Sequence, residues 1–193
     1  LLSRFVLMFS ILEGYLFPKT YPVTPDTTID QLIEQMVYQS HLILEQNKEA
    51  FEQSELSVHE IFTLASVIER EGVHEEDRAL ISGVFHNRLA QNMPLQTDIS
   101  VLYALHTHKE YITLKDIEVD SPYNTYLYPG LMPGPVNSPS ESAIIAALKP
   151  ENTDYLYFLA DIKTGEVYFS ETYDEHLELQ EKYVPSEVPK DNN

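Results

Sequence analysis

The sequence has no cysteine and no tryptophan, and it is poor in basic side chains. Without cysteine, a disulfide framework, a thiolate metal site and a cysteine nucleophile are all excluded. The 12 basic and 31 acidic side chains give a formal net charge of −19. A chain with so little lysine and arginine lacks the positive surface that neutralises phosphates, so we do not expect nucleic acid as a partner. Because the acids are spread along the chain, they predict a solvated, self-repelling surface.

Long apolar runs are missing as well. Residues 5–12 are apolar, but Glu13 interrupts them and the run is too short to span a bilayer. The run also lacks the basic start and the small-residue cleavage site of a signal peptide. Because the first residue is Leu1 rather than Met, we expect the chain to be part of a longer protein. Any membrane segment would then lie upstream of it.

Metal and phosphate motifs are absent too. There is no glycine-rich phosphate loop and no G-x-S-x-G turn. His106 and His108 form one histidine pair and His74, Glu75 and Glu76 another cluster, but neither has zinc-site spacing with a third ligand. We therefore expect these residues at the surface, and no metal or other cofactor.

What is present is enough apolar material for a core and a strong helical pattern. The 193 residues are 43% hydrophobic, and between 28 and 47 the apolar residues recur every three or four positions. Ser57 and Glu60 have capping-box spacing and begin a second helix, which Gly72 ends. Further helices are expected over 75–93, after Asp98, after Glu141 and over 172–183.

Strand signals are confined to two places. Residues 12–23 are aromatic and broken by prolines, so they indicate an extended stretch or an edge strand. Residues 154–170 alternate and turn at 163–165, which predicts a β-hairpin. A mainly helical chain with a small antiparallel hairpin predicts the α+β fold class. We divide it into an N-terminal segment (1–25), one domain (26–183) and a tail expected to fray (184–193).

Residues 120–139 contain five prolines, two glycines and three tyrosines. So many aromatics predict a long ordered loop rather than a linker. Ser138 and Glu141 end the loop with capping-box spacing, and Pro139 would be the first helical residue. Proline and glycine fix a backbone that can line a cleft, while tyrosine and asparagine suit sugars and peptides. The alternative is a rigid Ω-type loop that covers an edge of the core.

The second helix ends in three charged residues that are not equivalent. Projected at about 100° per residue from Val58, the apolar positions form one broad arc. Glu69 falls inside this arc at about 20°, Glu71 on its far margin at about 220°, and Arg70 outside it. A carboxyl among apolar neighbours has a raised pKa and can serve as a general acid. The alternatives are that Glu69 swings into solvent, or pairs with Arg78 or Arg88.

Five stretches, in order, resemble the catalytic region of the endolytic murein transglycosylases, the YceG-like family. They are LEGYLFPKTY (12–21), LASVIEREG (64–72), VFHNRLAQNMPLQTD (84–98), SPYNTYLYPGLMPGPVNSP (121–139) and YLYFLADIKTGEVYFS (155–170). The resemblance covers about residues 12–180. It implies internal cleavage of peptidoglycan glycan strands between N-acetylmuramic acid and N-acetylglucosamine, with a 1,6-anhydro-muramyl end left behind.

The resemblance also assigns roles to residues. The family's essential residue is the first glutamate of a motif that residues 65–71 match, which places the role of general acid and then base on Glu69. The residues expected to bind sugar and orient Glu69 are Gln96, Asp98, Tyr123, Asn124 and Tyr126.

Family members are anchored by an upstream transmembrane helix, so the resemblance implies a catalytic domain on the outer face of the cell membrane. It also makes cell-wall synthesis enzymes candidate partners. Two other functions stay open from the residues alone. One is a muramidase that uses a second carboxylate from Asp98, Glu71 or Asp120, and the other is a peptidoglycan-binding module without catalysis.

Overall fold

The computed structural model describes residues 12–72, 74–109, 111–161 and 164–183. The helices are α2 (Ile29–Gln46), α3 (Lys48–Gln53), α4 (Val58–Glu71), α5 (Arg78–Ala90), α6 (Asp98–Ala104), α7 (Glu141–Leu148) and α8 (Tyr173–Tyr183). Two short 3₁₀ helices, η1 (Glu75–Asp77) and η2 (Asp116–Glu118), and two strands, β1 (Tyr157–Ala160) and β2 (Val167–Ser170), complete the described elements. None of the helices in this part of the chain combines the length and the apolar content that a membrane span requires.

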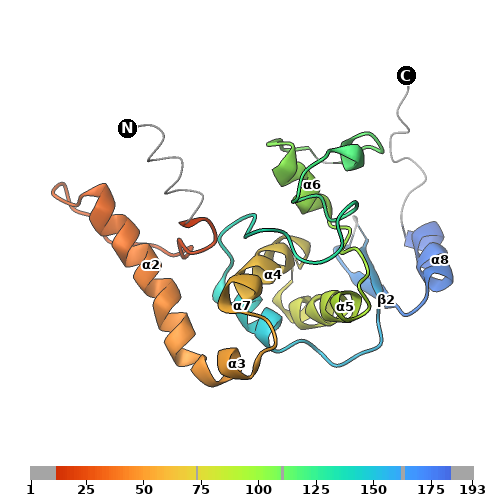
Figure 1. The fold of residues 1–193 in the computed structure, drawn as a ribbon, viewed down its shortest axis with the longest axis horizontal. Coiled ribbons are helices and arrows are strands. Elements are labelled where there is room, and N and C mark those ends of the chain that lie inside the picture. The colour runs from red at the N-terminus through yellow and green to blue at the C-terminus, as the bar shows by residue number, and fades with distance from the viewer. Residues whose placement is uncertain (1–11, 73, 110, 162–163, 184–193) are drawn as a thin grey trace.

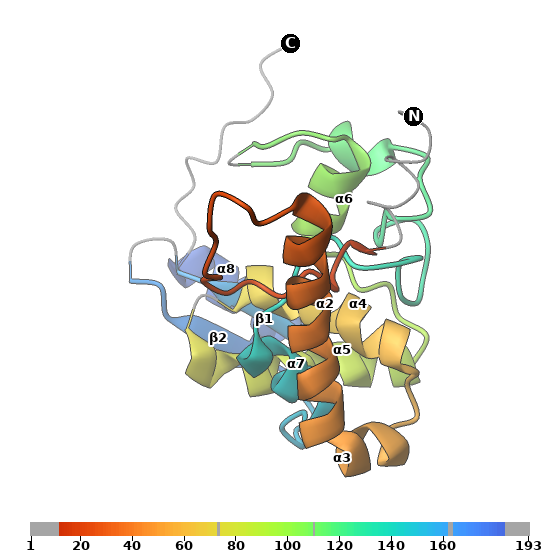
Figure 2. The same ribbon diagram turned by 90° about the vertical axis from the view of Figure 1, so that its left-hand side faces the viewer.

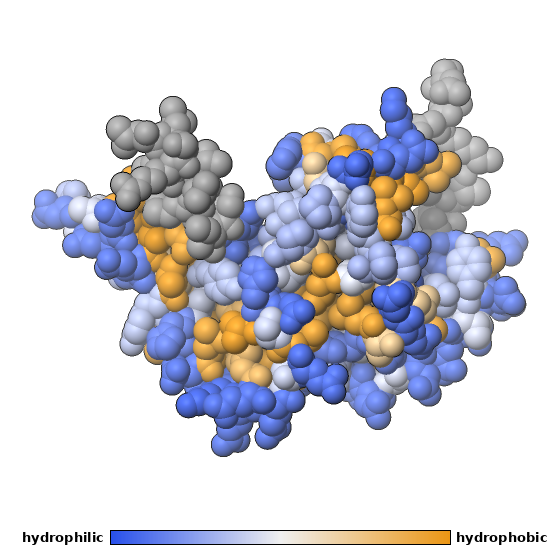
Figure 3. Space-filling view, viewed as in Figure 1, coloured by the Kyte–Doolittle hydropathy of each residue, from blue (hydrophilic) through white to orange (hydrophobic). Residues whose placement is uncertain are grey.

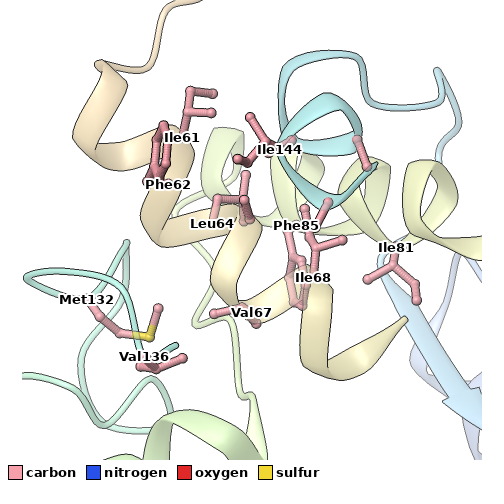
Figure 4. Packing of buried hydrophobic residues seen from close by; sticks show 14 of the residues in the cluster. Ile61, Phe62, Leu64, Val67, Ile68, Ile81, Phe85, Met132, Val136 and Ile144 are labelled. Carbon is pink, nitrogen blue, oxygen red and sulfur yellow. The ribbon is translucent and has the colours of Figure 1, made fainter. Parts of the chain in front are cut away.

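Helix α4 lies at the centre of the fold, with α5 and α7 packed against it and α6 projecting beyond its C-terminal end (Figure 1). All eight residues from Ile61 to Ile68 are buried, so every face of these two turns is covered. Figure 4 shows α4 surrounded by Phe85 of α5, Ile144 of α7 and Met132 of the proline-rich loop. Full burial of each such side chain contributes about 1.5–3 kcal/mol.

The proline-rich loop (120–139) is tied to α4 by hydrogen bonds. The backbone N–H of Val136 donates to the Ser66 hydroxyl at 3.0 Å, and the Asn137 amide donates to the Ser66 carbonyl at 2.6 Å. Met132 and Val136 are members of the buried core. The prediction of an ordered loop is confirmed, and the part of it near Ser66 covers the core as the alternative stated.

Helices α2 and α3 lie on one side of the molecule, and Figure 2 shows α2 passing in front of α4 and α7. The helix predicted over 28–47 is confirmed, and Thr28 and Gln31 form a capping box at its start. Helix α3 was not predicted. It is separate because Asn47 leaves the helical backbone region, with φ −115° and ψ 20°, and its side-chain amide bonds the Ile43 carbonyl.

The predicted hairpin and the α+β class are confirmed. Strands β1 and β2 pair antiparallel, with Tyr157 opposite Ser170 and Ala160 opposite Val167. Residues 162–163 of the turn lie outside the described residues, and Gly165 has φ +77°, which glycine adopts without strain. Helix α8 packs on the sheet, on the side of the fold away from α2 (Figure 1).

Two predictions about segment ends need correction, and two further predictions concern residues that the structure does not describe. Over 12–23 the edge strand, one of the two predicted alternatives, does not form: the segment begins with a turn, in which the Tyr15 N–H bonds the Leu12 carbonyl, and continues without regular structure. Helix α7 is capped by Ser140 rather than Ser138, so Pro139 lies outside the helix. Most of the apolar run 5–12 and the tail 184–193 lie outside the described residues.

Candidate active site

The last turn of α4 and Gly72 define the centre of the site. The Gly72 N–H bonds the Ile68 carbonyl at 2.8 Å, and a β-carbon at Gly72 would lie 2.7 Å from Arg78 Cγ. A side chain therefore does not fit where α4 ends and the chain turns toward α5. Because successive residues of a helix point about 100° apart, the last turn directs Glu69, Arg70 and Glu71 to three different surroundings.

Glu69 is held by an ion pair and two hydrogen bonds. Its Oε1 accepts from Arg78 Nη2 at 3.0 Å, and its Oε2 accepts from the Ser140 N–H at 3.0 Å and the Ser140 hydroxyl at 2.5 Å. The side chain is 25% exposed and that of Arg78 only 8%. Pairing with Arg78 was one of the alternatives from the sequence, and it is the one observed. These are the partners of an ionised carboxylate.

Arg78 makes Glu69 part of a larger network. Its guanidinium also donates to the Gly72 carbonyl at 3.2 Å and to the hydroxyls of Ser140 and Ser142. The network therefore ties the end of α4 to the starts of α5 and α7. It uses both oxygens of Glu69 within the protein, so the residue is built into the scaffold that fixes this turn.

Glu71 has a different environment. Its carboxyl is partly buried, and its pKa is raised from 4.5 to about 7, mainly by this burial. The negative charge of Asp98 contributes to the increase, while the positive charge of Arg70 opposes it. In the described part of the chain, no residue donates a hydrogen bond to this carboxyl. Glu71 is thus a carboxyl that exchanges its proton near neutral pH, as a general acid and base must.

Asp98 and Tyr126 stand beside Glu71. The Tyr126 hydroxyl donates to Asp98 Oδ1 at 2.6 Å, and burial together with this bond raises the pKa of Tyr126. Asp98 is the first residue of α6, and the preceding segment is fixed to the proline-rich loop. The Gln96 N–H bonds the Thr125 carbonyl at 3.1 Å, and the Thr97 N–H bonds the Thr125 hydroxyl at 3.0 Å.

Arg88 supports the segment that precedes Asp98. The buried guanidinium donates to the carbonyls of Leu156 at 2.6 Å and Leu95 at 2.9 Å, and lies 5.1 Å from the centre of the Tyr157 ring. Its Nη1 also reaches Gln96 Oε1 at 3.4 Å. The sequence offered Arg88 only as a partner for Glu69. Its structural role depends on contacts with β1, which no local pattern reveals.

The structure groups some of the predicted sugar-binding residues and separates others. Asp98 and Tyr126 touch each other beside Glu71, and Gln96 lies two residues before Asp98. Asn124 is fully buried, and its amide donates to the Ile117 and Val119 carbonyls at 2.8 Å. Its contacts hold the loop, so a direct contact between Asn124 and a sugar is not supported.

Tyr123 and the histidine clusters lie elsewhere. The Tyr123 ring packs against Tyr103 of α6, with ring centres 4.7 Å apart. His74, His106 and His108 are exposed, as predicted.

Comparison with known proteins places the chain in a family. Residues 3–182 match the model of the YceG-like family. A Bacillus subtilis protein named endolytic murein transglycosylase is 48% identical over 93% of this chain and 50% of its own length. A Streptococcus pneumoniae protein of the same name is 42% identical over 92% of this chain and 33% of its own length.

A solved structure agrees. The crystal structure of a YceG-like protein from Listeria monocytogenes matches with a TM-score of 0.83 and 49% identity, over 87% of this chain and 55% of that one. The chain spans about half the length, or less, of the relatives that it matches. The family model matches nearly the whole chain, and a solved YceG-like protein shares its fold. The chain therefore belongs to the YceG-like family.

Proposed function

We propose that this chain is the catalytic part of an endolytic murein transglycosylase that cuts peptidoglycan glycan strands. The names of its relatives support this activity. The observation that carries the proposal is the place of the Glu71 carboxyl: it is partly buried at the end of α4, beside the Asp98 carboxylate that Tyr126 holds. This environment raises its pKa to about 7, which suits a group that gives and takes a proton at neutral pH.

We infer that Glu71, rather than the Glu69 that the resemblance implies, is the acid, and the surroundings of the two side chains support this choice. Both oxygens of Glu69 accept hydrogen bonds from Arg78 or Ser140, so the carboxylate already has partners within the protein. Giving a proton away would first require Glu69 to hold one, at the cost of its ion pair. The Glu71 carboxyl has no such partner among the described residues, and the charge of Asp98 favours its protonated form.

The proposed reaction needs one carboxyl and no water. Protonated Glu71 gives its proton to the oxygen between N-acetylmuramic acid and N-acetylglucosamine as that bond breaks. The ionised carboxylate then accepts the proton of the muramic C6 hydroxyl while the C6 oxygen bonds to C1. This closes a 1,6-anhydro ring and returns the proton to Glu71. Because the attacking hydroxyl belongs to the same sugar, its effective concentration is high.

Asp98 has two parts in this proposal. Its negative charge raises the pKa of Glu71, and it can stabilise the positive charge that builds at C1. The hydroxyl of Tyr126 fixes the Asp98 carboxylate at 2.6 Å. Tyr126 is therefore a positioning residue for Asp98.

The same pair of carboxylates favours one second candidate, a muramidase that hydrolyses the bond. A hydrolase needs a second carboxylate that activates water or attacks C1, and Asp98, whose charge acts on Glu71, would be the candidate for that role. The two reactions differ by one water in their products, since hydrolysis leaves a reducing muramic acid rather than an anhydro end.

Digestion of purified peptidoglycan followed by mass spectrometry tests the proposal. Wild type should release fragments with anhydro ends, and Glu71→Gln should release none, while Glu69→Gln should keep activity in proportion to its folded fraction. Fragments with reducing ends would instead identify a hydrolase. Binding to peptidoglycan without any released fragment would identify a binding module, and full activity of Glu71→Gln would refute the assignment of the acid.

The substrate also sets the expected place of action. Peptidoglycan lies outside the cell membrane, so we propose that the chain works on that face, held by an upstream anchor, and that cell-wall synthesis enzymes are its partners. Fractionation of cells that carry the full-length protein tests the location, and a pull-down with that protein tests the partners.

A further inference from the structure

A cavity opens beside α6. We call it the α6 groove. It has a volume of about 780 Å³ and is lined by Glu13, Arg70, Ile99, Leu102, Tyr103, His106, Thr107, His108, Lys109, Val136 and Asn137. Figure 3 shows the surface hollowed between the side of the molecule that carries α2 and the projection that carries α6. The volume is in the range of small-ligand sites.

Two of the few cationic side chains of the chain lie in this groove. Of only 12 lysine and arginine residues in a chain of net charge −19, Arg70 and Lys109 line this cavity, together with His106 and His108. The acid in the lining, Glu13, accepts a hydrogen bond from the Tyr103 hydroxyl at 2.5 Å. The groove therefore presents positive groups on an otherwise acidic protein.

The two cations are held differently. Lys109 Nζ lies 2.7 Å from Asp116 Oδ1, and the amide and hydroxyl of Thr113 bond the same carboxylate at 2.9 Å. These contacts fix Lys109 at the edge of the groove with its side chain 43% exposed. Arg70 is exposed, and within the described residues no carboxylate forms an ion pair with it. Arg70 is thus the more available cation for an incoming anion.

The groove also has an apolar wall and a link to the proposed acid. Ile99 and Leu102 supply aliphatic surface to the lining. Arg70 precedes Glu71 on α4, and its charge acts on the Glu71 carboxyl. Ile99, which is also in the lining, follows Asp98 on α6, so the groove and the Glu71 and Asp98 carboxyls share the end of α4 and the start of α6. Apolar surface beside cations suits a short peptide with small apolar side chains and free carboxylates.

We propose that the α6 groove binds the peptide that muramic acid carries on its lactyl group, so that peptide-bearing glycan is preferred over bare glycan. This rests on the proposed function, because it places the muramic acid at Glu71. The carboxylates of the peptide would pair with Arg70 and Lys109, and its alanine side chain would lie on the aliphatic wall. The α6 groove would then be a specificity site that is separate from the acid.

Calorimetric binding of three disaccharide probes tests the proposal. The first is N-acetylglucosaminyl-N-acetylmuramic acid that carries L-Ala-D-Glu, the second has the carboxylates of that dipeptide amidated, and the third has only a methylamide on the lactyl group. The first should bind wild type about tenfold more tightly than the third, with the second in between. Equal affinities for all three probes, or no measurable binding of the first, would overturn the proposal.

Two variants and a matched control locate the binding. Arg70→Gln and Lys109→Gln should each weaken the first probe about threefold to tenfold and leave the third unchanged. Lys149→Gln removes an exposed lysine that lines other cavities, and it should change neither. If the control weakened the first probe as much as the groove variants do, the contribution would be net charge and not this site.

A negative result for peptide binding in the groove can be told apart from a negative result for the proposed transglycosylase activity. If the groove does not bind the peptide, wild type should cut bare and peptide-bearing glycan at similar rates and leave anhydro ends on both. Failure of the proposed function leaves no anhydro ends with either substrate, whatever the probes bind.

Discussion

Glutamine at position 71 should make the folded protein more stable at pH 8 while abolishing cleavage. A carboxyl whose pKa is higher in the folded state than in the unfolded state binds more protons when folded. For Glu71, with a pKa of 4.5 unfolded and about 7 folded, the contribution to the free energy of unfolding is fully present below about pH 4.5. That contribution is lost as the pH rises through 7.

The size of the effect follows from the two pKa values. The folded and unfolded pKa values of Glu71 differ by about 2.5, and a pKa difference of one corresponds to about 1.36 kcal/mol. The upper limit of the effect on the free energy of unfolding is therefore about 3 kcal/mol. Because the carboxyl is only partly buried, solvent screens it, and we expect about 1–3 kcal/mol. Glutamine resembles the protonated acid, so Glu71→Gln should gain this amount over wild type at pH 8 and nothing near pH 4.5. For a chain of this length the gain is about 2–4 °C in Tm per kcal/mol.

Glu69→Gln is the matched control, because it makes the same chemical change two residues away. It removes the carboxylate from the buried Arg78, so it should lower the free energy of unfolding by about 1–3 kcal/mol at pH 8. Urea unfolding at about pH 5 and pH 8 measures both variants. The reasoning is refuted if Glu71→Gln is less stable than wild type at pH 8, or if its difference from wild type does not change with pH.

Three further substitutions test other parts of the structure. Asp98→Asn removes the negative charge beside Glu71, so the pKa of Glu71 should fall and the alkaline limit of the pH–activity profile should move to lower pH. Ser66→Ala removes the acceptor of a buried N–H of the proline-rich loop, and chemical denaturation should show a loss of about 1–3 kcal/mol. Gly83→Ala would place a β-carbon 2.5 Å from the Glu151 carbonyl oxygen, so thermal melting should show a similar loss.

The local structure was largely predictable from the sequence. Ser57 caps α4 through the predicted capping box with Glu60, and Gly72 ends the helix as expected. The hairpin and α8 also follow from alternation and helical spacing. These features depend on residues a few positions apart, and the sequence carries that information directly.

The different surroundings of Glu69 and Glu71 could not be predicted in the same way. The helical projection assumed one buried face and one solvent face, whereas residues 61–68 of α4 are buried on all sides. Val58, from which the apolar arc was drawn, is 39% exposed. Position within the arc therefore did not tell which acid would be paired and which would lack a partner.

The partners that separate the two acids come from distant segments. Ser140, which lies 71 residues after Glu69, caps α7 and bonds Glu69 with the same hydroxyl, and this shifts the helix start away from Ser138. Asp98 meets Tyr126 across 28 residues because backbone bonds join the two segments. Such pairs are set by the tertiary fold, and a single sequence does not show them.

A titration of the glutamate side chains by carbon-13 NMR tests the central claim most directly. One carboxyl resonance should titrate with a midpoint near 7 and be missing from the spectrum of Glu71→Gln. It should remain in Glu69→Gln, and its midpoint should fall in Asp98→Asn. If the resonance lost in Glu71→Gln titrated near 4.5 instead, Glu71 would not hold a proton at neutral pH, and the proposed mechanism would be contradicted.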